Sequence, residues 1–200
     1  LLHDIGRFEQ LKRYDSFEPG TMDHAAYGVK VLFYEGMIRR FLPDDKWDSI
    51  IYTAIAHHSD YELPEISDPQ TLLHAKLIRD EDKLDNCRVK LVDSTSTFIN
   101  VSEEELGTQN ITQKVYETVF KNKCILSADR VTQMDYWVSY IVYFFDINFK
   151  ESFDIIAEND YLNRIIDRIP YSNPVTKEQM ENIRVYMQNF INSHTNGQSF

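Results

Sequence analysis

The chain has 200 residues, of which 42% are hydrophobic and 13% aromatic, so it can bury a sizeable core and is not disordered as a whole. Only six Gly and six Pro are present, which is too few for a turn-rich β-sandwich or barrel and favours long helices. The net charge of -11 argues against binding to duplex nucleic acid, because such binding depends on Lys and Arg that neutralise phosphates. A small phosphorylated ligand is not excluded, since a bound divalent metal can dominate the local field.

Neither the cysteines nor the apolar segments indicate export or a membrane. Cys87 and Cys124 lie far apart without the spacing of a disulfide framework, which favours reduced thiols in a cytoplasmic protein. The most apolar run, residues 137–149, is too short to span a bilayer and contains Asp146 and Asn148. No block of basic residues offers a patch for anionic lipids. We expect a cytoplasmic protein that does not bind membranes.

Apolar residues recur at helical spacing through the first half of the chain, which predicts helices over residues 22–42, 45–58 and 71–91. Asp44 or Asp45 is expected to cap the second of these helices. The apolar face of that helix is formed by Trp47, Ile50, Ile51, Ala54, Ile55 and His58. The third helix is expected to face inward with Leu73, Leu77, Leu84 and Cys87.

The second half of the chain stays helical in pattern but contains no motif with obvious chemistry. Ser102 with Glu105 predicts a capping box, and so does Thr176 with Gln179. An aromatic-rich segment at residues 130–149 is expected to pack in the core rather than to serve as a substrate platform.

Residues of metal-binding type recur on different predicted helices. They are His3, Asp4, His24, His57, His58 and Asp82. Imidazole and carboxylate together suit Fe, Mn, Zn, Ni or Co, and suit Mg less well because Mg prefers oxygen alone. Several lie in phase with apolar positions: His24 with Val31, His58 with Ile51 and Ile55, and Asp82 with Ala75 and Ile78. A desolvated His or Asp needs a partner. That partner is a metal ion or, for a single His–Asp pair, each other.

Four segments in this order resemble the HD superfamily. They are residues 2–8 (Leu-His-Asp-Ile-Gly-Arg-Phe), 23–28 (Asp-His-Ala-Ala-Tyr-Gly), 54–58 (Ala-Ile-Ala-His-His) and 78–85 (Ile-Arg-Asp-Glu-Asp-Lys-Leu-Asp). The first resembles the signature that gives the superfamily its name. The resemblance implies an all-α fold with an HD-domain helical bundle core over residues 1–92. The remainder, residues 93–200, is expected to be an additional helical extension packed on that core.

The resemblance also implies one or two divalent metal ions. His3, Asp4 and Asp82 would hold the first metal, with Asp4 bridging to a second. His24 and His57 would serve that second metal. Adjacent helical residues point about 100° apart, so His58 either joins these ligands or contacts the substrate. His74 matches no segment of the family and is expected to be structural.

The activity that the resemblance implies is hydrolysis of a phosphoester in a nucleotide or another small phosphorylated metabolite. The metals would activate a water for attack on phosphorus, with Asp4 central to the catalytic site. Arg7 resembles the basic position after the signature and would grip a substrate phosphate, and Lys83 is a second candidate for that role. The alternative is a catalytically silent HD module that binds a nucleotide or a partner protein, and an oxygenase on the same scaffold is a third. Whether the chain forms a homodimer is left open.

Two departures from the family are evident. The family usually supplies one more His from a helix ahead of the signature, whereas this chain begins at Leu1 without an initiator Met. We therefore expect that helix to lie in sequence upstream. After the twin histidines, residues 59–61 (Ser-Asp-Tyr) lack the Gly-Tyr-Pro pattern of the cyclic-di-GMP phosphodiesterase branch, which disfavours that branch.

Overall fold

The computed structural model describes residues 2–17 and 20–195, which form helices and loops and contain no β-strand. The predicted all-α fold is confirmed. No helix formed by these residues is long and apolar enough to cross a membrane. The chain divides into two compact units, unit 1 (Leu1–Asp82) and unit 2 (Lys83–Phe200). The division falls inside the continuous helix α4 (Pro69–Val92), ahead of the boundary expected after residue 92.

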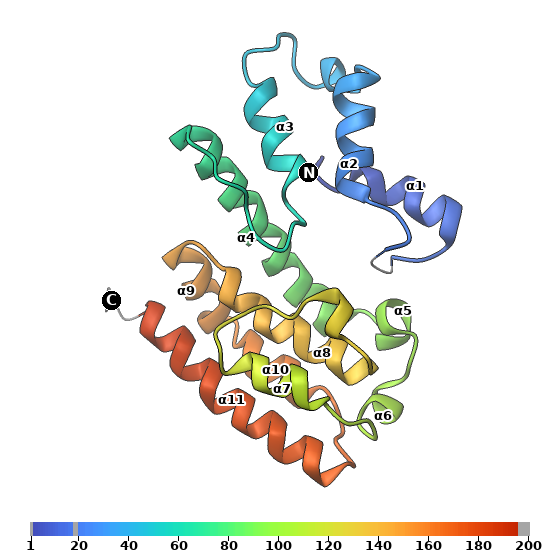
Figure 1. The fold of residues 1–200 in the computed structure, drawn as a ribbon, viewed down its shortest axis with the longest axis vertical. Helices are drawn as coiled ribbons and strands as arrows, with labels where there is room; N and C mark the ends of the chain where they lie inside the picture. The colour runs from blue at the N-terminus through green and yellow to red at the C-terminus, as the bar shows by residue number, and fades with distance from the viewer. Residues whose placement is uncertain (1, 18–19, 196–200) are drawn as a thin grey trace. The chain divides into compact units, whose positions relative to one another are not determined.

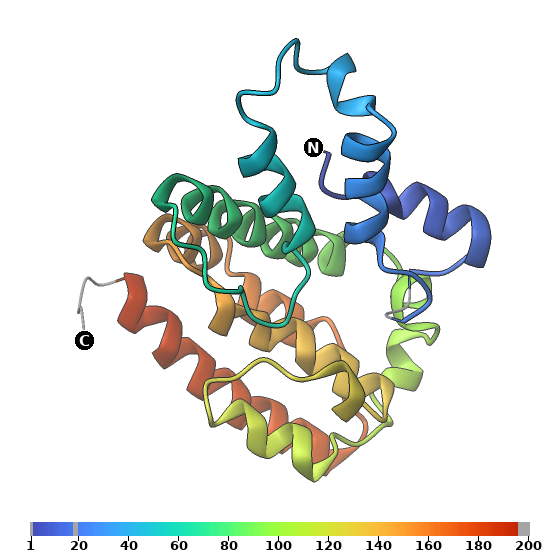
Figure 2. The ribbon, with the colours of Figure 1, turned by 45° about the horizontal axis from the view of Figure 1, so that its top comes forward.

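Unit 1 is built from short helices that lead into α4 (Figure 1). In chain order they are α1 (Ile5–Tyr14), α2 (His24–Val29), the π-helical turn η1 (Lys30–Tyr34), the 3-10 turn η2 (Met37–Arg40) and α3 (Asp48–Ala56). Helix α2 contacts both α1 and α3, and the segment before α1 lies between α2 and α3 in both views (Figures 1 and 2). A small hydrophobic cluster holds this unit together. Its buried members are Val29, Leu32, Ile38 and Ile55.

Gly6 allows α1 to pack directly on the backbone of α2. A Cβ atom at this position would lie 2.0 Å from the carbonyl oxygen of His24 and 3.0 Å from the amide nitrogen of Gly28. Only a residue without a side chain fits such a close approach. Because Asp4 immediately precedes α1 and His24 opens α2, this helix contact sets the distance between two of the predicted metal ligands.

The helix predicted over residues 22–42 is shorter than expected. Asp23 is the N-terminal cap of helix α2, and its side chain accepts a hydrogen bond from the amide of Ala26. Helix α2 ends at Val29 and continues directly into the π-helical turn η1. Gly36, at φ 77°, then turns the chain before η2. Apolar residues remain buried through η1 and η2, so the spacing in the sequence resembles that of one long helix.

Helix α3 is also shorter than the helix predicted over residues 45–58. It begins at Asp48 without a side-chain cap, so the expected caps Asp44 and Asp45 were wrong. It ends at Ala56, and His57 is its C-terminal cap residue. His57 and His58 therefore lie in the turn after the helix, where two neighbouring side chains can have unrelated surroundings.

The helix predicted over residues 71–91 is confirmed as α4, which extends slightly further at each end. Its inward face was partly misassigned, because Leu73 and Leu77 are 50% and 45% exposed. Four buried positions instead recur every four residues, at Ala75, Arg79, Lys83 and Cys87, and Asp80 and Lys90 are buried as well. Two of these four residues are charged, so the apolar pattern could not identify the face.

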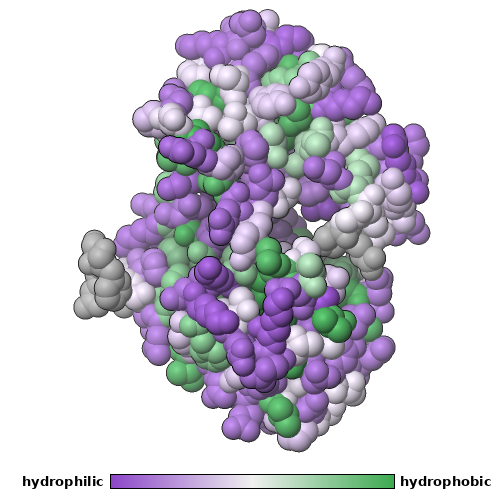
Figure 3. Space-filling view, viewed as in Figure 1, coloured by the Kyte–Doolittle hydropathy of each residue, from purple (hydrophilic) through white to green (hydrophobic). Residues whose placement is uncertain are grey.

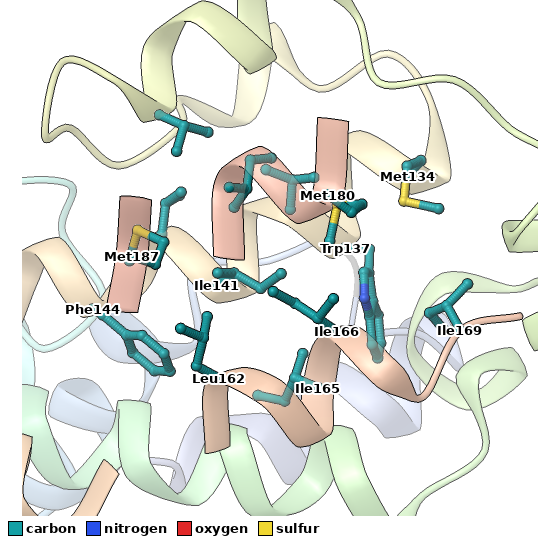
Figure 4. Close-up of a cluster of buried hydrophobic side chains, with 14 of the residues drawn as sticks. Met134, Trp137, Ile141, Phe144, Leu162, Ile165, Ile166, Ile169, Met180 and Met187 are labelled. Carbon is teal, nitrogen blue, oxygen red and sulfur yellow. The ribbon is translucent and has the colours of Figure 1, made fainter. Parts of the chain in front are cut away.

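Unit 2 comprises the rest of α4 and a set of helices with its own core. In chain order they are α5 (Thr95–Ile99), α6 (Glu103–Leu106), α7 (Gln113–Val119), the 3-10 turn η3 (Ser127–Asp129), α8 (Gln133–Ile141), the 3-10 turn η4 (Val142–Asp146), α9 (Lys150–Glu158), α10 (Tyr161–Asp167) and α11 (Pro174–Thr195). Helix α11 packs along α9 and α10 (Figure 1). Figure 4 shows Trp137 and Ile141 of α8, Ile166 of α10 and Met180 of α11 around one core, and all four are fully buried. The core role expected of residues 130–149 is confirmed for Trp137 and Phe144.

Hydrophilic side chains predominate on the face shown in Figure 3, in keeping with the net charge of -11.

The helix caps of unit 2 agree only in part with the predictions. Ser102 caps α6 and accepts a hydrogen bond from the amide of Glu105, as expected. Thr176 does not cap α11: it is buried, and its hydroxyl donates to the carbonyl oxygen of Gln109 at 2.7 Å. Asn173 caps that helix instead, since its Oδ1 accepts from the amide of Thr176. The prediction failed because Pro174 occupies the first helical position. The cap is therefore the residue before the proline, Asn173, which lies three residues ahead of the predicted Thr176.

Candidate metal centre

Unit 1 brings five of the six predicted metal ligands together from four elements. They are His3 and Asp4 before α1, His24 at the start of α2, His58 after α3, and Asp82 in α4. Ligand atoms of His3, Asp4 and His58 all lie within 4.8 Å of one another. His24 contacts this group through Asp4 and His58, and Asp82 contacts it through His3.

Asp4 lies at the centre of this cluster, and its two carboxylate oxygens face different partners. Oδ1 lies 3.3 Å from Nε2 of His24 and 3.6 Å from Nε2 of His58. Oδ2 lies 3.5 Å from Nε2 of His3, and that nitrogen is 3.6 Å from Oδ1 of Asp82. Oδ1 thus faces two imidazoles. Oδ2 faces the imidazole of His3, which also contacts the carboxylate of Asp82. A carboxylate in this position can bridge two cations.

The hydrogen bonding of His58 determines which of its nitrogens can bind a metal. Nδ1 lies 2.7 Å from the carbonyl oxygen of Ile55, which can only accept, so Nδ1 carries the proton. In the neutral ring Nε2 then carries no proton, and its lone pair is available to a metal. This nitrogen lies 3.0 Å from Nε2 of His24. A backbone carbonyl that orients an imidazole in this way is a common outer partner of metal-binding histidines.

The protonation states also suit a cation. Burial by itself raises the pKa of the Asp4 carboxyl, but the imidazoles of His24 and His58 and the charges of His3 and Arg7 outweigh burial and hold that pKa well below its usual range. Burial is the main reason that the pKa of His24 is lowered, although contact with Asp4 opposes this shift. Near neutral pH the cluster therefore offers an ionised carboxylate beside a neutral imidazole, the forms that bind metals.

The spacing of the ligand atoms fits a divalent ion. Nitrogen and oxygen ligands bound at about 2.1 Å stand roughly 3.0 Å apart at a right angle and roughly 3.4 Å apart in a tetrahedron. The separations in the cluster run from 3.0 Å, between His24 and His58, to 3.6 Å, between His3 and Asp82. Oδ1 of Asp4 is buried and has no hydrogen-bond partner among the residues that the structure describes. Such an atom is costly unless it binds a cation.

His57 is placed differently from His58. Its Nδ1 lies 2.6 Å from Oδ2 of Asp60, and its side chain is 34% exposed, compared with 1% for His58. The structure therefore favours His58 over His57 as the ligand shared with His24. His57 is next to His58 in the chain, but its half-exposed ring contacts Asp60 instead of the cluster.

This difference predicts unequal effects for the twin histidines. We expect His58→Ala to weaken Mn²⁺ binding by more than the roughly 10–100-fold typical of losing an outer partner, because it removes a ligand atom. His57→Ala should weaken binding by less than about tenfold, below the range for an outer partner of a ligand, since the ring of His57 contacts Asp60 rather than a ligand. Isothermal titration of both variants measures the two affinities, with circular dichroism as a check on folding. A larger loss in His57→Ala would reverse the assignment.

The two residues expected to hold a substrate phosphate have distinct surroundings. Arg7 is half-buried beside the cluster, with its Nε 3.5 Å from Asp4 Oδ1 and its Nη1 donating to Oε1 of Gln10 at 2.9 Å. Lys83 is the first residue of unit 2 and forms an ion pair at 2.7 Å with Asp146 of the same unit, and its side chain is only 9% exposed. Arg7 is therefore the stronger candidate, because Lys83 would have to leave a buried ion pair.

Two buried polar residues near the site were missed by the sequence analysis. Gln10, which is fully buried, links Arg7 to the hydroxyl of Thr21 through its Nε2, at 2.8 Å. Arg79 is 2% exposed and donates to the backbone of the twin-histidine turn. Gln10 belongs to no motif, and Arg79 lies in the segment 78–85 without a role expected for it. Polar residues at helical spacing usually face solvent. Only the register of each helix against its neighbours could have shown their burial.

No family model, curated protein or solved structure matches this chain.

Proposed function

We propose that the chain is a metal-dependent phosphohydrolase of the HD type that hydrolyses a phosphoester of a nucleotide or another small phosphorylated metabolite. The observation that carries the proposal is the central Asp4, whose two oxygens face two sets of ligand-type side chains and whose Oδ1 is buried without a hydrogen-bond partner among the described residues. This arrangement supports a site for two divalent ions. When bound, such ions activate water at neutral pH and neutralise charge on phosphoryl oxygens.

The chain's own residues account for the remaining requirements of the site. Asp4 stays ionised because its neighbours hold its pKa low, and His24 stays neutral because it is buried. Arg7 presents a guanidinium beside Asp4 in an orientation fixed by Gln10. A guanidinium can donate two parallel hydrogen bonds to a phosphate. The substrate phosphate is therefore expected next to Asp4, on the side of Arg7.

The proposed location is the cytoplasm. Both cysteines are free thiols, as a reducing compartment would keep them. Burial raises the pKa of Cys87 to about 12, so this thiol is also chemically inert at neutral pH.

Removal and replacement of the metal tests the proposed activity. The purified chain, treated with EDTA and dialysed, is expected to be inactive on a panel of nucleoside mono- and triphosphates. Addition of Mn²⁺ or Co²⁺ should restore release of inorganic phosphate from at least one member, because the ligand set suits these ions. Absence of metal binding at saturating Mn²⁺ and Co²⁺ would contradict the metal site. Metal binding without any turnover would contradict the hydrolase and favour the alternative, a silent module that binds a nucleotide or a protein.

A further inference from the structure

Arg79 of α4 is a buried cation that binds the turn after α3. Its Nη1 donates to the carbonyl oxygens of His57 at 2.9 Å, His58 at 3.3 Å and Asp60 at 2.7 Å, and its Nη2 lies 3.5 Å from the carbonyl oxygen of Tyr61. The whole residue is 2% exposed. A single guanidinium therefore gathers the backbone of the segment that contains both histidines.

These contacts solve a local problem of the backbone. Helix α3 ends at Ala56, and the turn that follows it has no helical ladder to pair its carbonyl groups. Such carbonyl groups need other donors where they are buried. The planar guanidinium offers several N–H donors in a fixed arrangement, so it can satisfy a group of carbonyls that point in one direction. Lysine concentrates its donors on one rotating ammonium and cannot reproduce this arrangement.

The contacts of Arg79 connect two parts of the metal centre, the turn that carries His58 and the helix that carries Asp82. On one side the turn carries His58, whose ring is oriented by the carbonyl of Ile55 and whose backbone is held by Arg79. On the other side Arg79 lies in α4, one helical turn before Asp82. Arg79 therefore fixes the backbone of one ligand relative to the helix that carries another.

We propose that Arg79 is a positioning residue that holds His58 in register with Asp82 at the metal centre. The inference rests on the proposed function, because it assumes that both residues bind divalent ions. Outer partners of metal ligands typically contribute about 10–100-fold to metal affinity. Arg79 is expected to contribute within that range, although it touches no metal itself.

Arg79→Lys in the full 200-residue chain tests the proposal with Co²⁺ as the probe. We expect a folded variant that binds Co²⁺ about 10–100-fold more weakly, with an altered visible absorption spectrum of the bound ion, because the ligand geometry changes. Arg88→Lys is the matched control, since Arg88 lies in the same helix and its side chain is 58% exposed. In Arg79→Ala, methylguanidinium should fill the vacated space and restore Co²⁺ affinity, without any effect on the wild type.

The outcomes separate the positioning role from the proposed function. Wild-type protein that binds no Co²⁺ would refute the metal centre itself. Wild-type protein that binds Co²⁺, together with a folded Arg79→Lys variant of equal affinity and unchanged spectrum, would refute only the role of Arg79. Loss of the fold in Arg79→Lys, combined with failure of methylguanidinium to restore Co²⁺ binding in Arg79→Ala, would also refute it, because Arg79 would then serve stability alone.

Discussion

Asp4→Asn is expected to abolish hydrolysis and to remove most of the bound metal from a chain that remains folded. The amide keeps the shape of the carboxylate but loses its charge, and it can no longer offer one anionic oxygen to each set of ligands. Loss of an outer partner already costs about 10–100-fold in metal affinity, so loss of the shared carboxylate should exceed that range. The fold should persist because Asp4 lies outside the hydrophobic cluster of unit 1.

Metal content by mass spectrometry and phosphate release measure these two effects, and far-UV circular dichroism reports the fold. The matched control is His74→Ala. His74 also lies in unit 1, on the exposed face of α4, and its loss should leave metal content and activity close to those of the wild type. Full metal content in Asp4→Asn would show that Asp4 is not a shared ligand. Equal losses in Asp4→Asn and His74→Ala would point to a general effect of substitution in this unit.

The sequence predicted the helical class and the position of α4, but not the ends of the earlier helices. Apolar spacing depends on which residues are buried, and burial continues through the turns η1 and η2 that follow α2. The pattern therefore could not reveal that Gly36 ends this run of helix. The inward face of α4 was missed for a related reason, because Arg79 and Lys83 occupy buried positions that an apolar pattern counts as exposed.

The candidate site was more accessible to sequence reasoning than the helix boundaries. His3, Asp4, His24 and Asp82 were proposed from residue type and from resemblance, and the structure brings all four together. The choice between His57 and His58 was beyond the sequence, because both were expected inside a helix and both in fact lie in the turn after it. Only the partners of each ring, Asp60 for His57 and the carbonyl of Ile55 for His58, separate their surroundings.

Gly6→Ala is expected to disrupt the metal centre without touching any ligand side chain. The added Cβ would lie 2.0 Å from the carbonyl oxygen of His24, and backbone atoms cannot move aside as a flexible side chain can. Helix α1 must therefore shift away from α2, which separates Asp4 from His24. Alanine is favoured over glycine in a helix by about 1 kcal/mol, whereas overpacking typically costs about 1–3 kcal/mol and occasionally more. An approach of 2.0 Å to a backbone oxygen belongs at the upper end of that range. The clash wins, so we expect a lower free energy of unfolding and, in the chain that remains folded, weaker Mn²⁺ binding.

Gly28→Ala provides the matched control in the same helix contact. A Cβ at Gly28 would meet Cγ2 of Ile5 at 3.4 Å, an ordinary contact, and the alanine favours α2. Urea unfolding and Mn²⁺ titration of both variants should therefore show a large loss for Gly6→Ala and little or none for Gly28→Ala. If Gly6→Ala binds Mn²⁺ as tightly as the wild type, the close approach of α1 to α2 does not set the ligand geometry. Equal destabilisation by both substitutions would mean that the contact tolerates no side chain at all, and the specific role of Gly6 beside His24 would be lost.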